Sequence, residues 1–196
     1  VFLGTELNRA SVTGIDLGLT LKAPVQDAID ALTQFSEEQL RSMDPQASDS
    51  TSVTASWQSL DLPISTNYPH IATGTNYKSQ ALEVGLEEEP FLFPKLTRAT
   101  RWNANVPKRT RLDYEAELCA VPIAAYRMQQ PARLDFILCR NYTDRAALVA
   151  QIDLDGPMGV TGFADGKGGS GMLSVGSLLI VPVSRQRFYS NLELGL

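Results

Sequence analysis

The chain has 196 residues, of which 43% are hydrophobic and 20% are charged, a balance typical of a globular protein and incompatible with wholesale disorder. It carries 17 Lys and Arg residues against 22 Asp and Glu residues, which gives a formal net charge of −5. An acidic chain without a dense basic block is a poor candidate for nucleic-acid binding, and no apolar run approaches the roughly 20 residues of a membrane helix.

The first third of the chain predicts a small helical segment. Residues 24–32 place Val, Ala, Ile and Leu at helical spacing behind a proline, and residues 36–39 form a capping-box pattern that opens a second short helix. Residues 44–59 are rich in Ser and Thr, which is typical of a linker. We therefore expect an N-terminal cap over residues 1–45 and a linker over residues 46–64.

The remainder, residues 65–196, predicts a mainly β (α+β) domain, either a sandwich or a partly closed barrel. Short apolar runs follow one another between Gly and Pro residues, and such spacing is typical of strands. The sequence predicts one helix, over Tyr77–Val84. It predicts strands over His70–Gly74, Leu112–Ile123, Leu134–Cys139 and Met172–Pro182.

The cysteines and the single histidine give weak signals. Cys119 and Cys139 each lie in an apolar stretch, and two cysteines cannot build a disulfide framework in a chain this long, so buried free thiols are favoured. The first residue is Val1 and no signal-like segment precedes the fold, which leads us to expect a cytoplasmic location. His70 stands alone, so a structural role is favoured over a catalytic one, and no Ser–His–Asp system or zinc site is expected.

The strongest chemical motif is the acidic strand at residues 112–121. Residues two apart on a strand point the same way, so Glu115 and Glu117 project together and could hold Mg²⁺, Mn²⁺ or Ca²⁺. An exposed acidic strand face is the alternative. A second motif, the glycine-rich segment at residues 162–171, differs from a phosphate loop because Thr161 replaces a glycine and Gly168 follows Lys167. It predicts a mobile loop whose lysine could close over a ligand, or else a plain turn.

Five motifs in this order resemble the fumarylacetoacetate hydrolase family over about residues 65–190. They are Asn76-Tyr77, the segment Phe91-Leu92-Phe93-Pro94-Lys95, the strand Asp113–Leu118, the stretch from Leu138-Cys139 to Thr143-Asp144-Arg145, and Gly162–Lys167. The resemblance implies a mixed β-roll, a commonly dimeric protein, and chemistry on 2-oxo or β-dicarbonyl acids with Mg²⁺ or a similar cation.

The resemblance also assigns roles to single residues. It implies that Glu115 and Glu117 bind the metal, that Lys167 supports the negative charge developing on the substrate, and that Arg145 and Tyr77 lie near the substrate. Glu83 matches the glutamate that orients the general-base histidine of the family.

Three departures qualify this resemblance. Gln80 stands where that histidine is expected, and Gln cannot take a proton from water. Asn141 stands where a third metal carboxylate is expected, next to Arg140, so a cation should bind weakly or not at all. The resemblance stops at Leu194–Leu196, before the strands that finish the roll, so the roll is expected to be incomplete or completed by a partner chain.

These departures leave two functions open. The first is an enzyme that acts on a 2-oxo or β-dicarbonyl acid by metal-assisted enolate stabilisation, as a lyase, decarboxylase, isomerase or cyclase with impaired water activation. In it Glu115, Glu117 and a weak third ligand, Asn141, would hold the metal, and Gln80 and Glu83 would position substrate or water. The second is a non-catalytic relative that binds a ligand or serves as a partner subunit. A homodimer or a partner chain is expected in either case.

Overall fold

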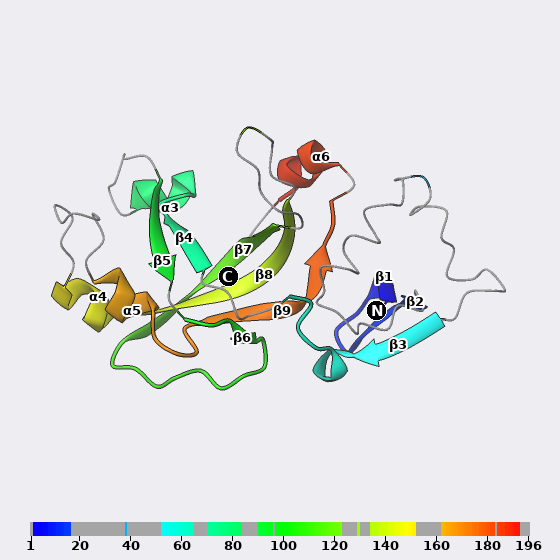
Figure 1. The fold of residues 1–196 in the computed structure, drawn as a ribbon, viewed down its shortest axis with the longest axis horizontal. Coiled ribbons are helices and arrows are strands. Elements are labelled where there is room, and N and C mark those ends of the chain that lie inside the picture. The colour runs from blue at the N-terminus through cyan, green and yellow to red at the C-terminus, as the bar shows by residue number, and fades with distance from the viewer. Residues whose placement is uncertain are drawn as a thin grey trace. The chain divides into compact units, whose positions relative to one another are not determined.

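A computed structural model describes residues 2–16, 38, 52–64, 70–83, 90–95, 97–122, 129, 134–151, 162–182 and 184–192 of the chain. Strands predominate over helices within these residues, which confirms the mainly β class (Figure 1). The strands are β1 (Phe2–Leu7), β2 (Ser11–Asp16), β3 (Ser52–Ser56), β4 (His70–Gly74), β5 (Phe91–Lys95), β6 (Thr100–Arg101), β7 (Leu112–Pro122), β8 (Leu134–Asp144) and β9 (Leu173–Ile180). The helices are η1 (Trp57–Ser59), α3 (Lys78–Glu83), α4 (Arg145–Gln151), α5 (Phe163–Lys167) and α6 (Arg185–Ser190).

The chain divides into two compact units, each assembled from separate segments. Unit 1 comprises Val1–Ser65, Leu118–Leu138 and Gly176–Gly195, and unit 2 comprises Thr66–Glu117 and Cys139–Val175. The return of the chain to unit 1 in two later segments was not expected, because sequence patterns show local elements and not long-range pairing.

Unit 1 contains a three-stranded antiparallel sheet of order β1-β2-β3. The turn after β1 is set by Asn8, whose Oδ1 accepts hydrogen bonds from the backbone N–H groups of Ala10 and Ser11, both at 2.8 Å. β3 pairs with β2 from residue 52 to residue 56, so the linker expected over residues 46–64 is wrong for this stretch. Its Ser and Thr residues alternate with Val and Ala, which suits a half-exposed strand. The helical cap expected over residues 1–45 is wrong for residues 2–16, which form β1 and β2. The two helices expected within it lie outside the described residues except at Glu38, which is helical.

Unit 2 contains the antiparallel pair β4 and β5, whose two faces differ sharply. The register places His70 opposite Lys95 and Ala72 opposite Phe93. The burial of β5 alternates along the strand, with Phe93 and Lys95 buried and Leu92 exposed. One face of the pair therefore points into unit 2 and carries Lys95 with the aromatic residues. β4 has the bounds that the sequence predicted.

The long strands belong to a four-stranded sheet of order β6-β9-β8-β7. The short strand β6 runs parallel to β9, with Thr100 opposite Ser174 and Arg101 opposite Val175. The expected strands over residues 112–123, 134–139 and 172–182 are confirmed, although β8 continues to Asp144. This continuation carries the functional candidates on β8 into unit 2. The expected helix near residues 77–84 is also confirmed, as α3.

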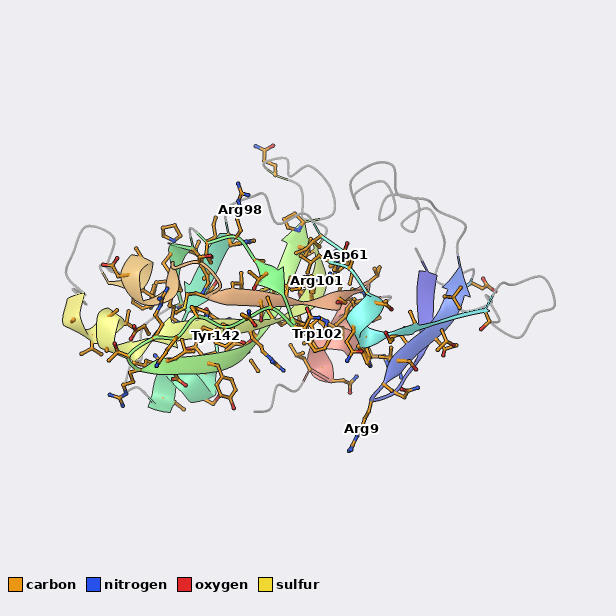
Figure 2. All side chains as sticks on the ribbon, turned by 90° about the horizontal axis from the view of Figure 1, so that it is seen from below. Arg9, Asp61, Arg98, Arg101, Trp102 and Tyr142 are labelled. Carbon is orange, nitrogen blue, oxygen red and sulfur yellow. The ribbon has the colours of Figure 1, made fainter. Side chains whose placement is uncertain are left out.

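Cys119 lies on β7 and Cys139 on β8, which are neighbouring strands, and both cysteines are disulfide-bonded. The expectation of free thiols is therefore wrong, since sequence separation does not reveal that the two strands are neighbours. Among the described residues, no helix is both long and apolar enough to cross a bilayer. Figure 2 shows the side chains of Arg9 and Arg98 projecting away from the ribbon, the usual position of a charged group.

Candidate functional site

The acidic face of β7 in unit 2 collects polar contacts from three other elements. Asp113, Glu115 and Glu117 alternate along the strand and are less exposed than their neighbour Tyr114, whose side chain points to the other face. The projection of Glu115 and Glu117 to one side is thus confirmed. Their surroundings are cationic and partly closed to solvent, so this strand face is not simply an exposed acidic surface.

Glu115 is the centre of the cluster. Its Oε2 accepts hydrogen bonds from Lys167 Nζ at 2.6 Å and from Asn141 Nδ2 at 3.0 Å. Its Oε1 accepts one from the Arg145 guanidinium at 3.0 Å. Hydrogen bonds between charged partners are shorter and stronger than neutral ones, so Glu115 holds β8, α4 and α5 to β7.

Arg145 joins two of the carboxylates on β7. Its Nε donates to Asp113 Oδ2 at 2.9 Å, while its terminal nitrogen reaches Glu115. Asp144 precedes it and accepts hydrogen bonds from the backbone N–H groups of Ala146 and Ala147, which caps α4 and fixes where that helix begins. The side chains of Arg145 and Asp113 are 35% and 47% exposed, so the cluster opens to solvent on their side.

The cluster shifts the pKa values of its own carboxyl groups in opposite directions. Burial raises the pKa of Glu117, and the negative charge of Glu115 raises it further, against the opposing effect of Lys167. For Asp113, burial alone would raise the pKa, but hydrogen bonds from Arg145 and from the Tyr114 backbone lower it below its ordinary value. Of these two carboxylates, Glu117 therefore protonates before Asp113 as the pH falls.

Asn141 lies on β8 and connects the carboxylates to a buried lysine. Its residue is 7% exposed, whereas the neighbouring Arg140 is exposed on the opposite face of the strand. Arg140 therefore does not add its charge to the cluster. The Asn141 amide donates through Nδ2 to Glu115, and its Oδ1 accepts a hydrogen bond from Lys95 Nζ.

Lys95 is a site residue that our sequence reasoning did not identify. It is only 2% exposed, and burial together with the nearby charge of Lys167 lowers the pKa of its amine to about 7. The missed signal was the period of β5, because Phe91, Phe93 and Lys95 fall on one face of a strand and two of them are large apolar residues. A lysine in that pattern is predicted to point inward.

Lys167 is a buried residue of the short helix α5, so the expectation of a loop is wrong over Phe163–Lys167. Gly162 opens α5 with a φ of 97°, a left-handed conformation that suits glycine. A Cβ added at Gly166 would lie 2.7 Å from Leu148 Cβ, which shows how closely α5 lies against α4 (Figure 1). The ring of Phe163 contacts Phe93, with ring centroids 4.7 Å apart. These contacts fix the backbone that carries Lys167.

The structure describes four other candidate residues in less detail. α3 holds Gln80 and Glu83 on its backbone, and their side chains lie outside the described part of the structure. Tyr77 precedes the same helix and is partly exposed. His70 lies opposite Lys95, and burial followed by the Lys95 charge lowers the pKa of its imidazole. The buried His70 Nε2 has no hydrogen-bond partner among the described residues.

The donor set of the cluster does not fit a divalent cation in this arrangement. Such a cation needs several oxygen donors turned toward one point. No group of three or more His, Cys, Asp or Glu side chains in the described ranges could hold one. Both oxygens of Glu115 accept from cationic groups, and Asn141 turns its nitrogen rather than its oxygen toward Glu115.

Comparison with known proteins adds nothing to this geometry, because no family model, curated protein or solved structure matches the chain.

Proposed function

We propose that the Glu115 cluster binds a small 2-oxo or β-dicarbonyl acid and stabilises the enolate formed when a bond beside the carbonyl group breaks. The observation that carries this proposal is the position of Lys95 and Lys167, two largely buried lysines on either side of the contacts made by Glu115 and Asn141. Lysines are seldom buried unless they are paired or functional, and buried titratable groups gather at functional sites.

The cluster offers the chemistry that an enolate needs. A lysine ammonium has three N–H donors, and Lys167 uses one of them on Glu115, which leaves others for a substrate oxygen. Arg145 on the open side has the forked geometry that binds carboxylates. Fixed donors aimed at an oxygen that gains negative charge stabilise the transition state because they need no reorganisation.

Decarboxylation of a β-oxo acid is the simplest reaction that such a site supports. The bond to the leaving carboxylate breaks, its electron pair forms the enolate, and carbon dioxide leaves. The enolate carbon then takes a proton from water. No general base is required, which suits a chain with Gln80 in place of the histidine of the family. Hydrolytic cleavage, which needs an activated water, is the less suitable reaction.

Several expectations from the sequence stay as parts of this proposal. They are the β-roll of the fumarylacetoacetate hydrolase family, roles for Gln80, Glu83 and Tyr77 beside the substrate, and a second chain as partner. The outer face of β4 and β5 supports a protein partner, because Ile71 and Leu92 are 74% and 66% exposed on a sheet of only two strands. The disulfide is more usual in an oxidising compartment, so it weighs against the cytoplasm.

The test is the decarboxylation of oxaloacetate to pyruvate, with a chelator present so that free metal does not catalyse it. We expect the wild-type chain to accelerate the reaction, and Lys167→Met to lose about 10²-fold or more of that acceleration, as when a transition-state donor is removed. Lys108→Met is the matched control, since Lys108 is exposed, and it should leave the rate unchanged. An equal rate in the wild-type and Lys167→Met proteins would overturn the proposal.

The alternative is a non-catalytic relative that binds a ligand or serves as a partner subunit. The observation that favours it is the loss of both the base and a metal carboxylate, whose places are taken by Gln80 and Asn141. This alternative predicts that oxo acids bind to the cluster while the rate of decarboxylation stays at that of the uncatalysed reaction.

A further inference from the structure

The orientation of the Asn141 amide is fixed from both sides. Lys95 offers N–H donors and no acceptor while it is protonated, so the group that faces it must be the amide oxygen. Glu115 as a carboxylate only accepts hydrogen bonds, so the group that faces it must be the amide nitrogen. A rotated amide would place N–H against N–H on one side and oxygen against oxygen on the other. Asn141 therefore keeps this orientation while Lys95 is protonated and Glu115 is a carboxylate.

This orientation matters for metal binding. An asparagine binds Mg²⁺ or Mn²⁺ through its carbonyl oxygen, and that oxygen would have to face the same point as the carboxylates of Glu115 and Glu117. In this site the oxygen faces Lys95 instead. The cations Lys167 and Arg145 also accompany Glu115, so the negative charge that would attract a metal ion is already balanced.

We propose that Lys95 excludes divalent cations from the Glu115 cluster, by holding the Asn141 oxygen away from the carboxylates, and so makes this a site that works without a metal ion. Lys95 is a specificity-determining residue in this role. The N–H groups of Lys95 and Lys167 then provide the positive potential that a metal ion would otherwise supply. The inference concerns the cluster alone and does not depend on which oxo acid binds.

The test compares Mn²⁺ binding to four proteins, measured from the free Mn²⁺ signal in electron paramagnetic resonance. They are the wild-type chain, Asn141→Asp, Lys95→Met and Lys95→Met/Asn141→Asp. We expect the wild-type chain to bind no Mn²⁺ at about 1 mM, a concentration at which weak cation sites are occupied. The affinity of the double variant for Mn²⁺ should be at least about tenfold higher than that of Asn141→Asp. The Asn141→Asp variant alone should have little more affinity for Mn²⁺ than the wild-type chain, because its new carboxylate pairs with Lys95.

Three outcomes would overturn the proposal. The first is Mn²⁺ binding by the wild-type chain that Glu115→Gln removes, and the second is an equal rise in Mn²⁺ affinity in Asn141→Asp and in the double variant. The third is that none of the four proteins binds Mn²⁺. Met is close to Lys in length and removes a buried charge, so Lys95→Met should fold, and thermal denaturation checks this. If it does not fold, the wild-type chain and Asn141→Asp still decide the question, because tight binding by Asn141→Asp with Lys95 in place contradicts the proposal.

Discussion

Lys95 and its neighbours show how a buried charge can be held in a polar cluster. Only 2% of the residue is exposed, yet its amine has a hydrogen-bond acceptor in Asn141 and carboxylates close by. These contacts offset part of the cost of removing a charge from water, but the pKa of about 7 shows that the offset is incomplete. The folded chain therefore holds this proton less tightly than the unfolded chain does.

This difference gives a signed prediction for stability against pH. The pKa of Lys95 is about 7 in the folded chain and near the ordinary value of 10.5 in the unfolded chain, so between these values the unfolded state binds more protons. The unfolding free energy of the wild-type chain should therefore rise relative to Lys95→Met from pH 7 to pH 10, by on the order of 3 kcal/mol.

Urea denaturation of both proteins across this pH range measures the difference. Lys108→Met serves as the control because its side chain is exposed, and its stability should follow that of the wild-type chain at every pH. A constant difference between the wild-type and Lys95→Met proteins over the whole range would contradict the burial of a charged amine at this position.

At the scale of elements, α5 is the part of the site that packing fixes most closely. Its first residue, Phe163, contacts the aromatic residues of β5, and Gly166 faces α4 without room for a side chain. The helix carries Lys167 to Glu115, so a shift of α5 should move Lys167 away from its partner.

Gly166→Ala tests this dependence. The added Cβ would lie 2.7 Å from Leu148 Cβ, so α4 and α5 must separate, and we expect the unfolding free energy to fall by about 1–3 kcal/mol. Oxaloacetate decarboxylation should fall as well. Gly169→Ala is the control, since its added Cβ would meet the flexible end of Arg109 at 2.9 Å, which can move aside. Equal stability and activity in both variants would contradict the close packing of α5.

The elements that the sequence revealed are those with a clear local period. β4, β7, β9 and α3 were predicted within a few residues, because alternating or helically spaced apolar residues show them directly. β3 was missed because its exposed positions are Ser and Thr, which also occur in linkers. α5 was missed because glycines have a low helix propensity and are typical of loops. One glycine, Gly166, lies within this five-residue helix, and Gly162 and Gly168 flank it.

For the molecule as a whole, the pairing of distant segments was beyond prediction. The sequence indicated that Glu115 and Glu117 project together, since that follows from one strand. It could not show that Lys95 and Asn141 would meet across 46 positions, or that the cysteines would be bonded. Motif order suggested Lys167, Arg145 and Asn141 as neighbours of Glu115, and the structure brings all three to that carboxylate. Only a resemblance suggested this, because no single motif carries the information.

The most direct test of the central claim, that the Glu115 cluster is a binding site for oxo acids, is a calorimetric titration with oxalate, a planar dianion that resembles the enolate of pyruvate. With a chelator in the buffer, the wild-type chain should bind oxalate with a Kd in the micromolar to low-millimolar range, which is a binding free energy of about −8 to −4 kcal/mol. Lys167→Met should weaken this binding at least about tenfold, the loss of one charged hydrogen bond, while Lys108→Met should leave it unchanged. The absence of binding to the wild-type chain, or equal binding to Lys167→Met, would contradict the account.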